Sequence, residues 1–395
     1  MTKGLFISSK KKQRLYEKFL KNKTLDNERN YKNYKKIFEK TKKKSKMNHY
    51  SSLIKENIGN SKKTWDVIKE VTGTKKTKDS FPNRIRDNDI DIYQQSEIAE
   101  KFNEFYVNVG KNLAEKIEPS SKHFKSYLKT CPNEMLEFEL SSEELRKAFH
   151  SLKPNKSEGI DEIHVNIIKS IYEFVEEPLY FIFNHSLKQG IFPNDLKIAK
   201  VIPLYKKDED DIVSNYRPVS ILPCFSKILE RIMYNRLYDH LIQNNLLYHK
   251  QFGFQRGHST EHAVVDLVDK ILKGFDQNNF TLGVFIDLSK AFDTVDHNIL
   301  LQKLEYYGVK KSYLKWFKSY LSERKQGVSY PNGISKLKNI ICGVPQGSIL
   351  GPLLFLIYVN DLYLSSKLLN FILFADDTNL FLTGKKLKNI VFYHE

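Results

Sequence analysis

Three aspartates lie where short apolar segments end, and together they could bind metal ions. Asp287 closes the β-prone segment of residues 281–287, and Asp376 and Asp377 lie between two apolar runs of residues 371–382. The second arrangement is typical of a β-hairpin with two adjacent carboxylates at its tip. Carboxylates at the tips of buried strands cost free energy unless cations compensate them, and Mg²⁺ prefers such oxygen ligands. The residues therefore predict a site for two divalent ions that could support an in-line phosphoryl transfer.

An ordinary solvated turn is the alternative for the hairpin, because Asp and Asn are common in turns. Asp287 is distant from the hairpin in the sequence, so only tertiary folding could bring the three carboxylates together. The second acidic strand and the motifs upstream of it favour the metal site.

The net charge of +17 is concentrated near the N-terminus. Residues 1–80 contain 24 Lys and Arg but only 8 Asp and Glu. Aromatic residues recur there at three- and four-residue steps, which predicts a helical arm. Such a basic segment attracts phosphate backbones without reading their sequence, and a solvated lysine-rich helix or tail is the alternative.

Composition argues against secreted and membrane-spanning classes. The three cysteines are widely spaced and odd in number, which favours a reducing environment. No apolar secretion signal opens the sequence, and the longest apolar run, residues 349–359, is too short to span a bilayer. We therefore expect an intracellular protein, in the nucleus and/or cytoplasm, that is not secreted and has no membrane partner.

The segments around these aspartates resemble the core motifs of reverse transcriptases. The three that would form the catalytic core read FIDLSKAFDTV (285–295), GVPQGSILGP (343–352) and FADDT (374–378). Upstream segments also fit the family, in its order: VIPLYKK (201–207), YRPVS (216–220) and QFGF (251–254). The similarity covers residues 140–395 and is closest to the non-LTR retrotransposon type, which includes LINE and jockey-like elements. Several motifs in order are far more specific than one.

The resemblance implies an α+β fold, a right-hand polymerase whose antiparallel palm sheet carries the three aspartates. It implies a basic, mostly helical arm and linker (1–95), a helical connector (96–139) and a reverse transcriptase domain (140–395) of fingers and palm, with core motifs at 197–382. The family would also lead us to expect a thumb and an N-terminal endonuclease. Neither is recognisable in this sequence, so we expect a thumbless chain that is truncated at both ends.

The resemblance also implies the ligands of the metal site. Asp287 and Asp376 would be the essential carboxylates, Asp377 a supporting one, and the main-chain carbonyl of Leu288 a further ligand. The expected cofactor is a pair of Mg²⁺ ions, with Mn²⁺ as a substitute.

A second set of residues would bind the dNTP. Lys206, or its neighbour Lys207, and Arg217 would clamp the triphosphate. Phe292 would exclude a 2′-hydroxyl, although core packing could also explain a phenylalanine there. The remaining contacts to nucleotide and template would come from Gln346 and Gly347, with a helix that starts at this motif. For Asp293, the sequence favours a helix N-cap over a second acid behind the metal ligands.

The function implied is that of an RNA-directed DNA polymerase acting on an RNA template, a DNA primer and dNTPs. The alternative is a catalytically silent remnant that only binds nucleic acid. A group II intron-type maturase and a viral RNA-dependent polymerase also remain open, although the FADD tip and the Ala291-Phe292 pair argue against the viral type. No glycine-rich phosphate loop supports an unrelated phosphotransferase.

Overall fold

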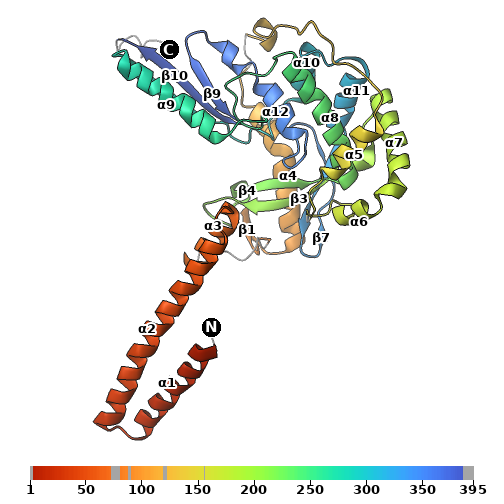
Figure 1. The fold of residues 1–395 in the computed structure, drawn as a ribbon. Helices are drawn as coiled ribbons and strands as arrows, with labels where there is room; N and C mark the ends of the chain where they lie inside the picture. Colours follow the sequence, from red (N-terminus) through yellow and green to blue (C-terminus); the bar gives the residue numbers. More distant parts are fainter. Residues whose placement is uncertain (1–2, 73–80, 88–89, 119–121, 155, 386–395) are drawn as a thin grey trace. The chain divides into compact units, whose positions relative to one another are not determined.

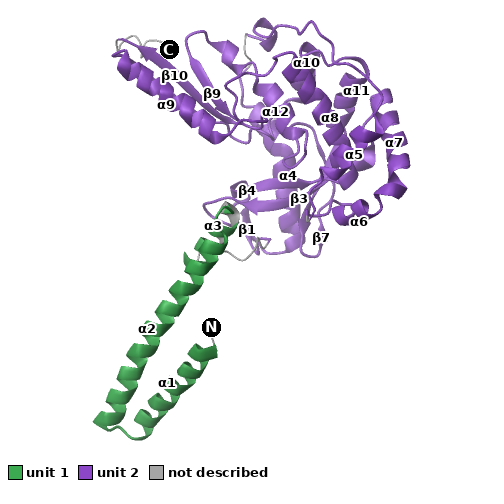
Figure 2. Ribbon diagram, in the orientation of Figure 1, with its two compact units in different colours: residues 1–80 green, residues 81–395 purple. Residues whose placement is uncertain are grey.

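The computed structural model describes residues 3–72, 81–87, 90–118, 122–154 and 156–385. The chain forms two compact units, residues 1–80 and residues 81–395 (Figure 2). The polar segment of residues 73–95, which contains Pro82, predicts a linker, and its first part (73–80) lies outside the described residues. So does the end of the predicted reverse transcriptase domain (386–395).

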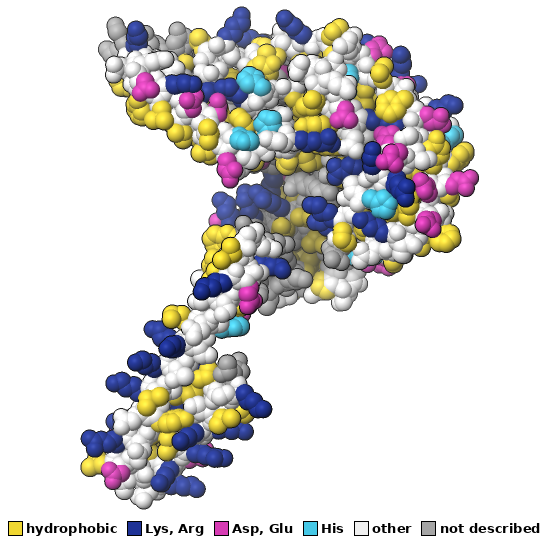
Figure 3. Space-filling view, viewed as in Figure 1, with side chains coloured by type: hydrophobic (Ala, Val, Ile, Leu, Met, Phe, Trp, Pro, Cys, Tyr) yellow, Lys and Arg dark blue, Asp and Glu magenta, His cyan; other side chains and the backbone are white. Residues whose placement is uncertain are grey.

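The first unit is a helical arm. It contains α1 (Lys3–Lys21), α2 (Leu25–Glu56) and α3 (Ser61–Thr72). Thr24 begins α2 as its N-cap, accepting a hydrogen bond from the Asn27 N–H. The rings of Tyr16 and Tyr31 lie 5.0 Å apart between α1 and α2. Lysine and arginine side chains project along both helices (Figure 3), so the positive charge of the sequence lies on an exposed helical surface.

The second unit is a mixed α+β structure, as the sequence predicts. Its mixed sheet has the order β4-β3-β6-β7, with β8 also paired to β6. The strands are β3 (Ile198–Tyr205), β4 (Tyr216–Ile221), β6 (Arg324–Tyr330), β7 (Gly333–Ile334) and β8 (Lys338–Ile340). A separate hairpin of β1 (Ile85–Asp87) and β2 (Ile90–Ile92) lies within the stretch that the sequence predicts as linker.

A second sheet carries the acidic motifs. It is antiparallel, with the order β5-β10-β9, and consists of β5 (Phe280–Asp287), β10 (Asp377–Gly384) and β9 (Asn370–Phe374). The hairpin predicted for residues 371–382 is therefore present. Helix α9 (Thr260–Asp276) runs along this sheet (Figure 1).

The other helices of the second unit surround its main core, except α4, which packs on the mixed sheet and belongs to a second core cluster. They are α4 (Gln95–Ala114), α5 (Ser142–His150), α6 (Val165–Ser170), α7 (Tyr172–Gln189), α8 (Cys224–Gln243), α10 (His297–Tyr306), α11 (Lys311–Leu321) and α12 (Gly351–Val359). The Trp316 ring, which is fully buried, packs edge-on against Phe192 and stacks on Tyr320. Among the described residues, no helix is both long and apolar enough to cross a membrane.

Candidate active site

The register of the antiparallel sheet brings two acidic motifs together. Asp377, the first residue of β10, pairs directly with Asp287, the last residue of β5. Residues that face each other across an antiparallel pair point to the same side of the sheet. Asp376 lies in the turn between β9 and β10, directly before Asp377, and lines one pocket together with Asp287.

The turn that carries Asp376 is held by a buried glutamine. Ala375 adopts a left-handed backbone with φ of 56°, which costs free energy for a residue other than glycine. The side-chain Oε1 of Gln251 accepts hydrogen bonds from the Ala375 N–H (2.8 Å) and the Gly253 N–H (2.9 Å). Its Nε2 donates to the Ala375 carbonyl (3.3 Å). Gln251 thus fixes the residue that precedes Asp376, a role that the sequence motif QFGF did not reveal.

One pocket of about 390 Å³ contains most of the predicted site residues. Two of the predicted carboxylates, Asp287 and Asp376, lie on its wall. The other predicted residues that line it are Leu288, Lys206, Lys207, Arg217, Phe292 and Gln346. These residues come from the segment just after β3, from β4, from the end of β5 and the turn after it, from the loop before α12 and from the hairpin turn, so the tertiary fold assembles the pocket.

Positive charge gathers in the same pocket as the two carboxylates. Lys206 directly follows β3, Arg217 lies on its partner strand β4, and both are exposed. Lys290 joins them, although the sequence did not single it out. Burial lowers the pKa of the Lys290 ammonium and the charges of Lys206 and Arg217 add to this, while Asp293 opposes it. The pocket therefore offers cations that suit a polyphosphate beside carboxylates that suit a metal ion.

Lys290 is held in place by the turn that follows Asp287. Its backbone is left-handed, with φ of 53°, and its Nζ donates to the Ser214 carbonyl at 3.2 Å. Uncommon backbone conformations of this kind cluster at functional sites. The residue types around Lys290 do not predict a left-handed turn. The only sequence signal for a role of Lys290 in the site is its position inside the FIDLSKAFDTV motif.

The helix-cap interpretation of Asp293 is wrong. Asp296 is the N-cap of α10, because its side chain accepts a hydrogen bond from the Ile299 N–H at 2.8 Å. The carboxylate of Asp293 instead accepts hydrogen bonds from Gln346 Nε2, at 2.9 Å to each oxygen. Burial raises the pKa of Asp293.

Phe292 is partly buried and makes aromatic contacts as well as lining the pocket. Its ring stacks on Phe355, 4.7 Å away, and meets the Phe254 ring edge-on at 6.0 Å. The Phe292 ring therefore packs against other aromatic rings and also borders the pocket, so core packing and sugar selection are compatible. Its role toward a nucleotide stays a prediction.

Two predicted residues do not line this pocket. Asp377 instead lines a neighbouring pocket between α9 and the sheet, which Asp287 also borders. Gly347 packs against the main chain of Ser220, where a Cβ atom would lie 2.3 Å from the carbonyl oxygen. The helix expected at this motif begins only at Gly351, so Gly347 belongs to a loop.

The donor atoms of the pocket suit a hard divalent cation. Asp287 and Asp376 supply carboxylate oxygens, and Leu288 lines the same pocket. Within the described part of the chain, no three His, Cys, Asp or Glu side chains gather closely enough to hold a metal ion. Mg²⁺ is commonly bound through one or two carboxylates plus the phosphates of its substrate, so two carboxylates fit this ion.

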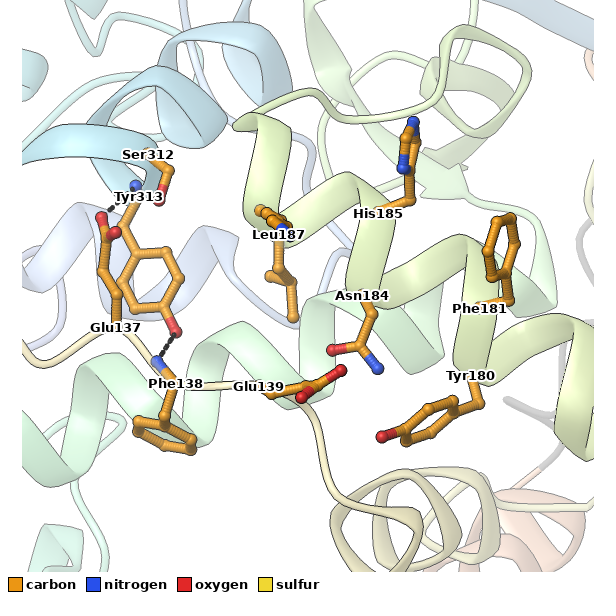
Figure 4. Close-up of a pocket in the computed structure, with 11 residues that line it drawn as sticks. Glu137, Phe138, Glu139, Tyr180, Phe181, Asn184, His185, Leu187, Ser312 and Tyr313 are labelled. Atoms are coloured by element: carbon orange, nitrogen blue, oxygen red, sulfur yellow. Dashed lines mark hydrogen bonds between the residues drawn. The ribbon is translucent and has the colours of Figure 1, made fainter.

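A larger pocket of about 510 Å³ lies elsewhere in the second unit, between α7, α11 and residues 137–139 (Figure 4). Glu137 accepts a hydrogen bond from the Tyr313 N–H at 3.1 Å, and the Tyr313 hydroxyl accepts one from the Phe138 N–H at 3.4 Å. None of the predicted site residues lines this pocket. The candidate active site is therefore identified by the carboxylates and cations that line the smaller pocket, and not by pocket volume.

Comparisons with known proteins point to the same segments. Residues 204–392 match the family model described as reverse transcriptase (RNA-dependent DNA polymerase). The chain is 37% identical over 227 residues to the probable RNA-directed DNA polymerase from transposon BS of Drosophila melanogaster, which is 56% of this chain and 24% of that protein. It is 34% identical over 221 residues to the RNA-directed DNA polymerase from mobile element jockey of the same species, again 56% and 24% of the two chains.

A third relative comes from another insect. The chain is 30% identical over 244 residues to the retrovirus-related Pol polyprotein from type-1 retrotransposable element R1 of Bradysia coprophila, covering 60% of this chain and 24% of the relative. The chain thus matches about a quarter of the length of these relatives.

Proposed function

We propose that this chain is an RNA-directed DNA polymerase of the type that non-LTR retrotransposons carry, because residues 204–392 match the reverse transcriptase family model. The observation that carries the proposal is the one pocket that is lined by Asp287 and Asp376 together with Lys206, Lys207 and Arg217. Its substrates would be a dNTP, a DNA primer and an RNA template.

In this proposal the antiparallel sheet β5-β10-β9 is the palm, and the fingers extend from about residue 140 to residue 280. The division into an arm and linker (1–95), a connector (96–139) and a polymerase domain (140–395) remains part of the proposal. The reaction would take place inside the cell, in the nucleus and/or the cytoplasm.

The proposed reaction exchanges one P–O bond for another. The 3′-hydroxyl of the primer loses its proton to water as its oxygen bonds to the α-phosphorus of the dNTP, the bond from that phosphorus to the bridging oxygen breaks, and pyrophosphate leaves. Two bound Mg²⁺ ions, or Mn²⁺, would make the primer hydroxyl a better nucleophile and neutralise charge on the reacting phosphates.

The side chains have separate parts in this reaction. Asp287 and Asp376 would hold the ions, with the Leu288 carbonyl as a main-chain ligand and Asp377 as a supporting acid behind Asp287. Arg217 offers a two-pronged donor and Lys206 a point charge to the triphosphate.

Sugar and base would meet the other side of the pocket. The flat ring of Phe292, fixed by Phe355, would leave no room for a 2′-hydroxyl and so favour dNTP over rNTP. Gln346 would contact the nucleotide, while Gly347 would let the loop approach the template closely.

A binding protein without catalysis is the second candidate, and the lysine-covered helices of the first unit favour it. Such a chain would bind RNA with an affinity that falls steeply as salt concentration rises. It would not need Asp287 or Asp376 for this.

Primer extension separates the two candidates. The chain, its Asp287→Asn variant and the surface control Asp276→Asn are each given poly(rA)/oligo(dT), dTTP and Mg²⁺ or Mn²⁺. Asp276 is an exposed carboxylate at the end of α9 and outside the pocket, so its variant should incorporate dTTP normally. The Asp287→Asn variant should lose at least about 100-fold in rate, the size of effect expected when a group that stabilises reacting charge is removed. No incorporation by any of the three, with salt-sensitive RNA binding kept by all, would refute the polymerase and favour the binding protein.

A further inference from the structure

Gln346 is fixed in the pocket by two separate anchors. Its main-chain carbonyl accepts a hydrogen bond from the Ser220 N–H at 2.8 Å, which ties the loop to β4. Its side chain is anchored by Asp293 alone among the described residues, through the two contacts of 2.9 Å from Nε2. The main chain of Gln346 therefore does not depend on Asp293, whereas the orientation of its amide does.

The loop that carries Gln346 has further main-chain contacts of its own. The Gly343 N–H donates to the Val295 carbonyl and the Val344 N–H to the Phe292 carbonyl, both at 2.8 Å. At the other end of the loop, Glu230 accepts a hydrogen bond from the Ile349 N–H at 2.6 Å. Removal of the Asp293 side chain should therefore release one amide without unfolding the loop.

Both oxygens of Asp293 accept hydrogen bonds, and this sets the direction of the Gln346 amide. A carboxylate is an acceptor only, so the NH₂ end of the amide must face Asp293. The Oε1 atom of Gln346 then points away from Asp293, and no donor among the described residues forms a hydrogen bond with it. Hydrogen bonds to an ionised partner are about twice as strong as neutral ones, so this orientation is well determined.

We infer that Asp293 is a positioning residue that turns Gln346 so that its carbonyl, not its NH₂ group, faces the nucleotide. The pocket would then recognise a hydrogen-bond donor on the dNTP through an acceptor whose direction is fixed before binding. This inference rests on the proposed polymerase function. Asp293 itself acts through Gln346 and makes no contact with the reacting atoms.

Lys290 gives a second route by which a change at Asp293 could act, because the two charges interact electrostatically. Loss of Asp293 would remove a negative charge from a lysine beside the proposed triphosphate site. An experiment on Asp293 must therefore distinguish coupling to Gln346 from coupling to Lys290.

Double-mutant cycles make this distinction. Steady-state dTTP incorporation on poly(rA)/oligo(dT) is compared for Asp293→Ala, Gln346→Ala, Lys290→Ala and the two double variants that contain Asp293→Ala. We expect Asp293→Ala to lower kcat/KM for dTTP about 10- to 100-fold, the range for loss of a charge-assisted hydrogen bond. The double variant with Gln346→Ala should be no worse than Gln346→Ala alone, whereas the effects of Asp293→Ala and Lys290→Ala should multiply.

A conservative variant provides a rescue. Asp293→Asn keeps one carbonyl oxygen that can accept from Gln346 Nε2, so it should recover a large part of the lost kcat/KM. Urea unfolding of each variant, with Asp276→Ala as the surface control, separates this from a general loss of stability. Multiplying effects of Asp293→Ala and Gln346→Ala, or a kcat/KM that Asp293→Ala leaves unchanged, would overturn the inference.

The inference and the proposed function fail in different ways. If the unaltered chain does not incorporate dTTP, the proposed function fails, and the same cycle is then measured as the dissociation constant for fluorescently labelled dTTP. Coupling between Asp293 and Gln346 in that constant would support the inference without polymerisation. A chain that neither incorporates nor binds dTTP would overturn both.

Discussion

Replacement of Gln251 by methionine should loosen the hairpin turn that carries Asp376. Methionine has nearly the same length and volume, so it should fill the same space without leaving a cavity. It cannot accept the hydrogen bonds that Gln251 Oε1 takes from the N–H groups of Ala375 and Gly253. The change therefore isolates the hydrogen bonds from the packing.

The size of the effect follows from the groups left without partners. Gln251 and Ala375 are 3% and 8% exposed, so water reaches the turn poorly. A buried donor without a partner costs about 1–3 kcal/mol, and two such donors are created. Allowing for partial relaxation, we expect the free energy of unfolding to fall by about 2–4 kcal/mol. The left-handed backbone of Ala375 should relax as well, since Gln251 holds both its N–H and its carbonyl.

Urea unfolding and primer extension measure the two consequences. Gln243→Met is the matched control, because Gln243 is exposed at the end of α8 and its replacement should change the unfolding free energy by less than about 0.5 kcal/mol. At low urea, where Gln251→Met stays folded, dTTP incorporation should fall by about 100-fold, since small displacements of reacting groups have effects of that size. Equal stability of the two variants would refute the assignment of Gln251 as the clamp of this turn.

Three further variants test other parts of the structure. Glu230→Gln should lower the unfolding free energy by about 2–4 kcal/mol in urea titrations, because a fully buried carboxylate that compensates the Arg324 charge is lost; an unchanged midpoint would contradict this. For Lys270, burial and the nearby Lys250 lower the pKa of the ammonium from 10.5 to about 8, so between these pH values the unfolded chain binds more protons and stability rises with pH. Lys270→Met should abolish this pH dependence of stability and raise the free energy of unfolding by about 1–3 kcal/mol at pH 7. If thermal melts of the variant still show stability rising over this pH range, Lys270 is not the cause of the pH dependence. Phe292→Val should improve rUTP incorporation relative to dTTP about 10- to 100-fold, and an unchanged ratio would leave Phe292 as packing alone.

Much of the local structure follows from the pattern of residue types. The apolar, β-prone run of residues 198–205 predicts a strand, and that strand is β3. The amphipathic pattern of residues 225–244 predicts a helix, and that helix is α8, shifted by one residue at each end. Gly190 ends α7 in the left-handed conformation, as expected for a glycine after a helix. These elements have strong periodicity and clear end signals, which depend only on neighbouring residues.

Pairing between distant strands could not be predicted in this way. Residues 216–220 were identified as a motif, yet they form the edge strand β4, in which Pro218 lies directly opposite Pro203 of β3. Two prolines facing each other give no local strand signal, because each lacks an N–H donor. The parallel pairing of β3 with β6 joins segments more than a hundred residues apart, and nothing in either segment specifies it.

In the site too, some residues could be predicted from local sequence patterns, whereas others depend on contacts between distant elements. The residue types and their resemblance to a family predicted the acids, cations and aromatic ring that line one pocket. The parts played by Gln251, Lys290 and Asp293 depend on turns and on contacts between elements. For Asp293 the residue pattern favours a helix cap, because a cap needs only neighbouring residues whereas the contact with Gln346 needs the whole fold.

The most direct test of the central proposal is dTTP incorporation on poly(rA)/oligo(dT) by the chain and by its Asp376→Asn variant, at equal concentration and with Mg²⁺ or Mn²⁺. We predict extension of the primer by the unaltered chain and a loss of at least about 100-fold in the variant, because one of the two carboxylates in the pocket can no longer bind a cation. Equal incorporation by both proteins would contradict the assignment of Asp376 to the metal site, and the absence of incorporation by the unaltered chain would contradict the polymerase itself.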